Sequence, residues 1–127
     1  MREMGEAECL EALAAHEVGR VAYCDDGGAV VLPVNYTLDQ DTILIRVAPH
    51  SGLARHLRGA QASFQIDDFD AYNQTGWSVL VRGEASYVDS GDLPAGQDPP
   101  FAWAEGQRTL HIRITPHEIT GRRLIPA

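Results

Sequence analysis

The chain has 127 residues, of which 44% are hydrophobic and 22% charged, and this composition is typical of one soluble globular domain. Its formal net charge of −8 argues against a nucleic acid partner, because phosphate backbones are bound by basic surfaces. The sequence contains neither a run of about 18 apolar residues, which a membrane span needs, nor the apolar core of a secretory signal. We therefore expect a single cytoplasmic domain over residues 1–127 that contacts no membrane.

The basic residues, cysteines and histidines limit which anion and metal sites the chain can form. All ten basic residues are arginine, so an anion site must use guanidinium groups, backbone amides or histidine. Cys9 and Cys24 are expected to be reduced, half-buried thiols, as is usual in a cytosolic chain. The five histidines are scattered, and no cysteine–histidine cluster has the spacing of zinc ligands, so we expect no metal site.

The first third of the chain predicts a helix followed by three strands. Residues 6–16 have helical spacing, with Leu10, Leu13 and Ala14 on the buried face. The period then changes to two, and the Asp-Gly pair at 26–27 predicts a hairpin between the first two strands. The three strands, which we expect to form a meander, are residues 18–24, 29–38 and 42–48.

Pro33 falls inside the second of these strands. Proline has no amide proton to donate to a ladder, so the strand should lie at an edge or carry a bulge at this point. A bulge would re-aim the side chains and amides of Val34, Asn35 and Tyr36, whereas a plain edge strand would not.

A short helix and three further strands complete the prediction. Ser51 is a natural N-cap, Leu53 and Leu57 lie one turn apart on a buried face, and Gly59 is expected at the C′ position. Loops are predicted over residues 67–75 and over the Gly- and Pro-rich residues 89–107. Strands are predicted over 61–67, 76–88 and 108–121, with Ala62, Phe64, Ile66, Leu110, Ile112 and Ile114 facing the core. Trp77, Val79 and Val81 share one face of their strand, and Trp77 is either a core residue or a surface for a flat aromatic ligand. About six short antiparallel strands, one N-terminal helix and one inserted helix favour a mainly β, Greek-key-like barrel.

The stretch VAPHSGLARHLRG, residues 47–59, offers the clearest chemistry. A strand ends, a Ser-Gly pair follows and a helix begins, so the first helical amides, the helix dipole and the Ser51 hydroxyl can receive a phosphate. Gly52 lets an anion approach the backbone, and Arg46 and Arg55 can supply guanidinium groups. In the alternative interpretation, Ser51 only caps the helix and both arginines are solvated.

Three segments together resemble the pyridoxamine 5′-phosphate oxidase-like split-barrel proteins, and the small actinobacterial-type members most closely. The segments are GRVAYCDDGGAVVLPVNYTLDQDTILIRVAPHSGLARHLRG, FQIDDFD with TGWSVLVRGEA, and HIRITPHEITGRR. The combination of LPVNY with GWSVLVRG is the specific part of the pattern. The resemblance implies a six-stranded split β-barrel, a homodimer, and two flavin sites, usually for FMN, in grooves at the dimer interface.

The resemblance also implies which residues contact the cofactor. The backbone at residues 32–35 would run along the isoalloxazine edge, residues 46–48 would line the ribityl chain, and Ser51 would meet the phosphate. Trp77 and Ser78, on the long strand over residues 76–88, would also approach the flavin, either from the same chain or from the dimer partner. The full set is Leu32, Pro33, Val34, Asn35, Arg46, Val47, Ala48, Ser51, Gly52, Arg55, Trp77 and Ser78.

The sequence departs from the family pattern at one place. Members that bind flavin commonly carry Lys or Arg directly after the serine, whereas this chain has Gly52 and Leu53. Losing one or two charge-assisted hydrogen bonds, each worth about 1.5–3 kcal/mol, would weaken FMN by about tenfold to several thousandfold unless Arg46 or Arg55 compensates.

Three functions are therefore compared. The first is an FMN-dependent oxidoreductase with a small-molecule substrate. The second is a split barrel that binds another cofactor, either F420 or haem, and the third is a non-enzymatic dimeric protein that binds a small molecule. A true pyridoxamine phosphate oxidase is not expected, because Arg122 and Arg123 are interpreted as part of a solvated tail. No residue is predicted to act as a catalytic acid, base or nucleophile.

Overall fold

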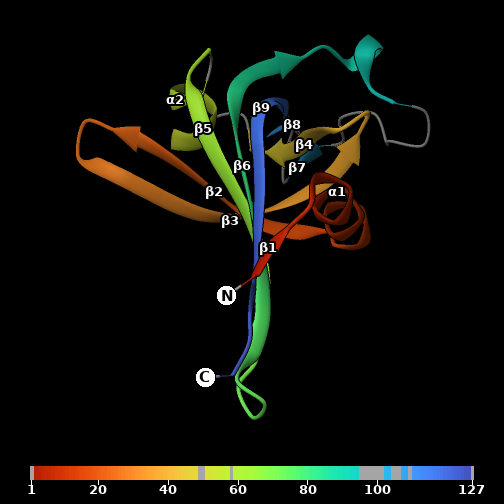
Figure 1. Cartoon of the computed structure of the whole chain (residues 1–127). Coiled ribbons are helices and arrows are strands. Elements are labelled where there is room, and N and C mark those ends of the chain that lie inside the picture. The colour runs from red at the N-terminus through yellow and green to blue at the C-terminus, as the bar shows by residue number, and fades with distance from the viewer. Residues whose placement is uncertain are drawn as a thin grey trace.

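The computed structural model describes residues 2–48, 51–57, 59–94, 102–103, 107–108 and 110–126, and Figure 1 shows the arrangement of their elements. In chain order the elements are β1 (Arg2–Met4), α1 (Glu6–Ala15), β2 (Val18–Asp25), β3 (Gly28–Asp39), β4 (Thr42–Val47), α2 (Gly52–His56), β5 (Gln61–Asp70), β6 (Thr75–Val88), the 3₁₀ helix η1 (Ser90–Asp92), β7 (Ala102–Trp103), β8 (Gln107–Arg108) and β9 (Leu110–Leu124). Within these ranges, no helix has the length and hydropathy that crossing a membrane requires.

Antiparallel strands close into a barrel. Around it the order is β9-β4-β3-β2-β5-β6, and β6 pairs back to β9. These are the six predicted strands, and β2, β3 and β4 form the predicted meander. The mainly β barrel with an N-terminal and an inserted helix is confirmed. Two features do not follow from the sequence pattern: β1 joins the outer edge of β9, and β7 pairs with β8 inside the segment predicted as a loop.

The β5–β6 hairpin is longer than predicted. β5 continues through Asp70 and β6 begins at Thr75, so most of the loop predicted at residues 67–75 is strand. One carboxylate builds the turn: Asp70 accepts hydrogen bonds from the amides of Tyr72 and Asn73 at 3.0 and 3.2 Å, and from Asn73 Nδ2 at 2.7 Å. The hairpin extends away from the two helices, with the C-terminal part of β9 alongside β6 (Figure 1).

Alternating side chains fill the barrel interior, as the period of two predicts. Large side chains with almost no exposed surface are Phe64, Leu13, Ile43, Leu44, Ile45, Leu57, Ile66, Ile112, Ile114, Val21, Val79 and Val81. The prediction for α1 is partly wrong, because Ala14 is exposed and Cys9 is buried instead. The reason lies on β9, where Gly121 leaves room for the Cys9 sulfur. Cys24 is also exposed rather than half-buried.

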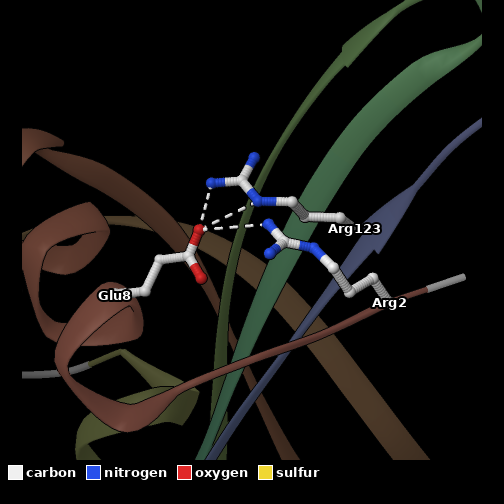
Figure 2. Close-up of polar contacts among 3 residues, drawn as sticks. All are labelled: Arg2, Glu8 and Arg123. Atoms are coloured by element: carbon white, nitrogen blue, oxygen red, sulfur yellow. Dashed lines mark hydrogen bonds and ion pairs between the residues drawn. The ribbon is translucent and has the colours of Figure 1, made fainter.

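An ion-pair cluster ties α1 to the two strands beside it, as Figure 2 shows. Glu8 Oε2 accepts hydrogen bonds from Arg123 Nη2 and, at 2.9 Å, from Arg123 Nε, and it lies 3.7 Å from Arg2 Nη2. The hydrogen bond from Arg123 is the main reason that the pKa of Glu8 lies below its usual value. The interpretation of Arg122 and Arg123 as a solvated tail is therefore wrong, because both belong to β9 and Arg123 holds a carboxylate.

Candidate functional site

The barrel is split between β3 and β4. Their pairing ends at Tyr36 and Ile45. Beyond this point the ladder pairs residues 28–35 of β3 with β2, and residues 46–47 of β4 with β9. The β2–β3 hairpin, orange in Figure 1, projects to one side of the barrel. Among the described residues, two strand edges without a ladder partner therefore diverge from one point, and a flat ligand with hydrogen-bonding edges can lie between them.

Pro33 lies on the open half of β3. The β2–β3 register passes through Arg20 and Pro33 without a shift, so the edge-strand alternative is confirmed and the bulge is not observed. Leu32, Pro33 and Asn35 are exposed. The structure thus presents this predicted contact segment at the mouth of the split.

Ser51 caps α2 as predicted. Its hydroxyl accepts a hydrogen bond from the amide of Ala54 at 3.1 Å and donates one to the carbonyl of Ala48 at 2.8 Å. A phosphate at this place would therefore have to draw the hydroxyl proton away from Ala48. The C′ prediction for Gly59 is wrong, because Leu57 is the C-cap of α2; Gly59 follows two residues later with a φ of +69°, and its amide donates to the Ala85 carbonyl at 3.0 Å.

The first turn of α2 places an arginine close to Gly52. Leu53 is only 3% exposed and packs in the core, so this position cannot present a charge to a ligand. Arg55 instead folds back over the turn, as the sequence suggests. Its Nη2 lies 3.9 Å from the point that a Cβ on Gly52 would occupy.

Arg46 is exposed on β4, and its cross-strand neighbour on β9 is His111. His111 is only 4% exposed, and its Nε2 has no hydrogen-bond partner among the described residues. Burial, and after it the charge of Arg46, lowers the pKa of this imidazole. A neutral ring does not compensate the guanidinium charge, so Arg46 stays available to an anion. Because Ile112 and Ile114 face the core, the alternation of the strand predicts that His111 faces outward. The burial of His111 therefore could not be predicted from the sequence.

Trp77 and Ser78 lie on β6, which does not border the split. Strands β2 and β5 lie between β6 and β3. Trp77 packs edge-on against His16 at the end of α1, with ring centroids 5.1 Å apart. Ser78 lines a hollow of about 200 Å³ together with Gln65 and Arg122. The contact of these two residues with a ligand in the split stays a prediction.

The outer face of β2 and β3 carries both apolar and polar side chains, Arg20 and Asn35 among the latter. Val18 and Val31 are each 59% exposed. Ala22, Cys24 and Ala29 line a groove of about 680 Å³ that continues over β5 and β6. Gln61, Ser63, Arg82 and His117 also line this groove, so its surface is mixed.

A six-stranded barrel that opens between two strands, with a serine-capped helix at the opening, defines a split-barrel protein. The sequence pattern agrees with this class. The pyridoxamine 5′-phosphate oxidase family matches residues 5–123, and the chain belongs to this family.

Individual relatives support the assignment. The chain is similar to the solved structure of a FAD binding protein from Mycobacterium smegmatis, with 32% identity, a TM-score of 0.81 and coverage of 98% of both chains. An uncharacterised Mycobacterium tuberculosis protein, Rv0080, is 26% identical over 97% of this chain and 85% of its own length. A FAD and haem binding protein from M. smegmatis is 16% identical and covers all of this chain and 75% of its own; its TM-score of 0.73 shows the shared fold.

Proposed function

We propose that the protein is a cytoplasmic, FMN-dependent oxidoreductase that acts on a small molecule. The observation that carries the proposal is the split between β3 and β4, where two open strand edges diverge. Membership of the pyridoxamine 5′-phosphate oxidase family supports it, because the resemblance implies a flavin along residues 32–35 and 46–48.

The residues present fit a flavin nucleotide. The open edge at residues 32–35 offers backbone donors and acceptors to a ring edge, and the exposed Leu32 offers an apolar surface to its face. Arg46 and Arg55 bring positive charge to the other end, where a phosphate is expected. Bound FMN supplies the hydride and electron transfer. The chain's own part is to orient the ring, exclude water from it and neutralise the phosphate.

We also propose that the working form is a homodimer. Trp77 and Ser78 lie on β6, which does not border the split, and the resemblance allows a partner to bring them to the ring. The exposed apolar face around Val18 and Val31, together with the open edge of β3, offers a surface that a second copy would cover. Each flavin would then lie between two chains.

FAD is the second candidate cofactor. The M. smegmatis protein that shares 32% identity with this chain is named a FAD binding protein, and this observation favours FAD. Both nucleotides contain the same flavin ring and at least one phosphate, so Arg46 and Arg55 suit either of them.

A titration tests the proposal. The purified protein should quench the fluorescence of FMN or FAD at one flavin per chain, and light scattering should give the mass of a dimer. Tighter binding of FMN than of FAD supports the first candidate, and the reverse order supports the second. A protein that binds neither flavin contradicts the cofactor assignment, and a monomer at micromolar concentration contradicts the two-chain site.

A further inference from the structure

A hollow of about 200 Å³ lies on the outer face of β5, β6 and β9, away from the split. Its lining consists of Gln65, Ser78, Leu80, Thr120, Gly121 and Arg122. The antiparallel register explains this grouping, because it places Ser78 directly opposite Arg122. In the next row of the sheet, Leu80 lies between Gln65 and Thr120. Three strands thus bring one guanidinium, two hydroxyls and one amide to the same place.

The two neighbouring arginines of β9 have different surroundings. Arg123 faces α1 and binds the Glu8 carboxylate, as Figure 2 shows. Arg122 faces the hollow on the other side of the sheet, because successive side chains of a strand point to opposite faces. Within the described part of the chain, Arg122 makes neither a hydrogen bond nor an ion pair. Its donors are therefore available to a ligand in the hollow.

The acidic residues near the hollow do not neutralise this guanidinium. None of the lining residues is a carboxylate, and each of the four polar side chains can donate a hydrogen bond. Asp67 lies opposite Ser78 on β5, but Arg20 Nη1 already binds it at 2.9 Å. Glu3 lies opposite Arg122 on β1, where it is exposed, and no ion pair joins the two in the described structure. The donors and the positive charge of the hollow therefore match an anion.

The size and charge of the hollow favour a small carboxylate. Drug-sized ligands occupy cavities of about 300–1,000 Å³, so a hollow of about 200 Å³ accepts a smaller molecule. The guanidinium presents two parallel N–H donors, which match the planar carboxylate group. One positive charge also balances one carboxylate, whereas it does not balance a phosphate dianion. Leu80 offers an apolar surface to the hydrocarbon part of such a ligand.

We propose that this hollow binds a small organic acid, with its carboxylate on Arg122 and Ser78 and its hydrocarbon part against Leu80. Binding of the acid needs no flavin. If a partner chain brings Ser78 to the flavin, as proposed above, the acid lies beside the ring. Small carboxylates are then the substrate class of the enzyme, and only this last step rests on the proposed function.

A titration with benzoate tests the site in the purified protein, with benzamide as the uncharged counterpart. The backbone amide resonances of Ser78 and Gly121 should shift saturably with benzoate and not with benzamide. Arg122→Gln should lower benzoate affinity about tenfold or more, because a hydrogen bond to a charged group is lost. Arg122→Lys keeps the charge without the planar fork, so it should recover only part of this loss.

Arg82→Gln is the matched control for Arg122→Gln. Arg82 is an exposed arginine on the same outer face of β6, and it lies outside the hollow, 3.8 Å from Glu118. Benzoate affinity should be kept in this variant. Because Arg122 has no partner to lose among the described residues, both variants should melt at the wild-type temperature. Equal benzoate affinity in the wild type and Arg122→Gln, or no saturable shift at all, overturns the proposal.

The absorbance of bound FMN separates the acid site from the flavin assignment. Benzoate should shift the flavin absorbance band in the wild type and not in Arg122→Gln. If benzoate binds through Arg122 and leaves the flavin spectrum unchanged, the acid site stands and its role as a substrate site is wrong. If the protein binds benzoate and no flavin, the acid site stands and the proposed function fails. If it binds flavin and no benzoate, the proposed function stands and this inference fails.

Discussion

Replacing Tyr36 by phenylalanine should destabilise the protein and weaken its cofactor site together. Tyr36 is the last β3 residue to pair with β4 before the two strands diverge. Its hydroxyl donates to the carbonyl of Leu13 at 2.7 Å, and its amide donates to the carbonyl of Glu17 at 2.9 Å. These bonds hold the end of α1 and the chain after it against β3, at the point where the split begins.

The expected loss of unfolding free energy follows from the environment of the Leu13 carbonyl. Leu13 lies in the last turn of α1, where carbonyls have no intrahelical partner, and its side chain is fully buried. Removing the hydroxyl leaves this carbonyl without its partner, at a cost of about 1–3 kcal/mol. The packing of the ring on Phe64, edge to face at 4.7 Å, is retained. For a chain of this length, about 3–5 °C of melting temperature is lost per kcal/mol.

Urea unfolding at neutral pH measures this loss, with Tyr23→Phe as the control. Tyr23 has no hydrogen bond to lose, so its variant should stay within about 0.5 kcal/mol of the wild type. Burial also raises the pKa of Tyr36 to about 12 from a usual value of 10.0. The unfolded chain thus loses this proton first, and wild-type stability should fall from pH 10 upward, more steeply than that of Tyr36→Phe. Equal stability of the two phenylalanine variants at neutral pH would refute the reasoning.

Three further predictions concern single side chains. Arg46→Gln should leave the fold intact and lower FMN affinity about tenfold without affecting riboflavin, because one charge-assisted hydrogen bond is lost; equal FMN affinity in a fluorescence titration would contradict this. The lowered pKa of His111 means that the unfolded chain takes up its proton first, so wild-type stability should fall as the pH drops below about 6.5. His111→Gln should show a flatter dependence in urea unfolding, and parallel curves would count against a buried neutral imidazole. Gly121→Ala should cost about 1–3 kcal/mol in thermal unfolding, because its Cβ would come within 2.6 Å of Cys9 Sγ, and a wild-type melting temperature would exclude this contact.

Periodicity predicted the barrel well because each strand has one buried face. Ala62, Phe64 and Ile66 alternate inward on β5 as expected, and Leu53 and Leu57 face the core from α2. Turn composition was less reliable. The aspartates at 67–70 suggested a loop, yet only Asp70 builds the turn, and the others lie on a strand whose pairing with β6 decides the conformation.

The sequence indicates the strands that border the split, but not the surroundings of each polar side chain near it. Residues 32–35 and Arg46 lie on the two strands that separate beyond Tyr36 and Ile45, and Ser51 follows β4 as the N-cap of α2. His111 was missed, because it lies on a regular strand and only the packing of another element shows what its polar atom faces. Trp77 and Ser78 lie away from the split within one chain, so their role stays a prediction about the dimer.

A crystal structure of the protein grown with FMN tests the central claim most directly. The account predicts a flavin ring between the open edge of β3 at residues 32–35 and the end of β4, with its phosphate at the first turn of α2 and residues of a second copy closing the other side. A split filled by water or by the protein's own side chains, with excess FMN in the crystal, would contradict it.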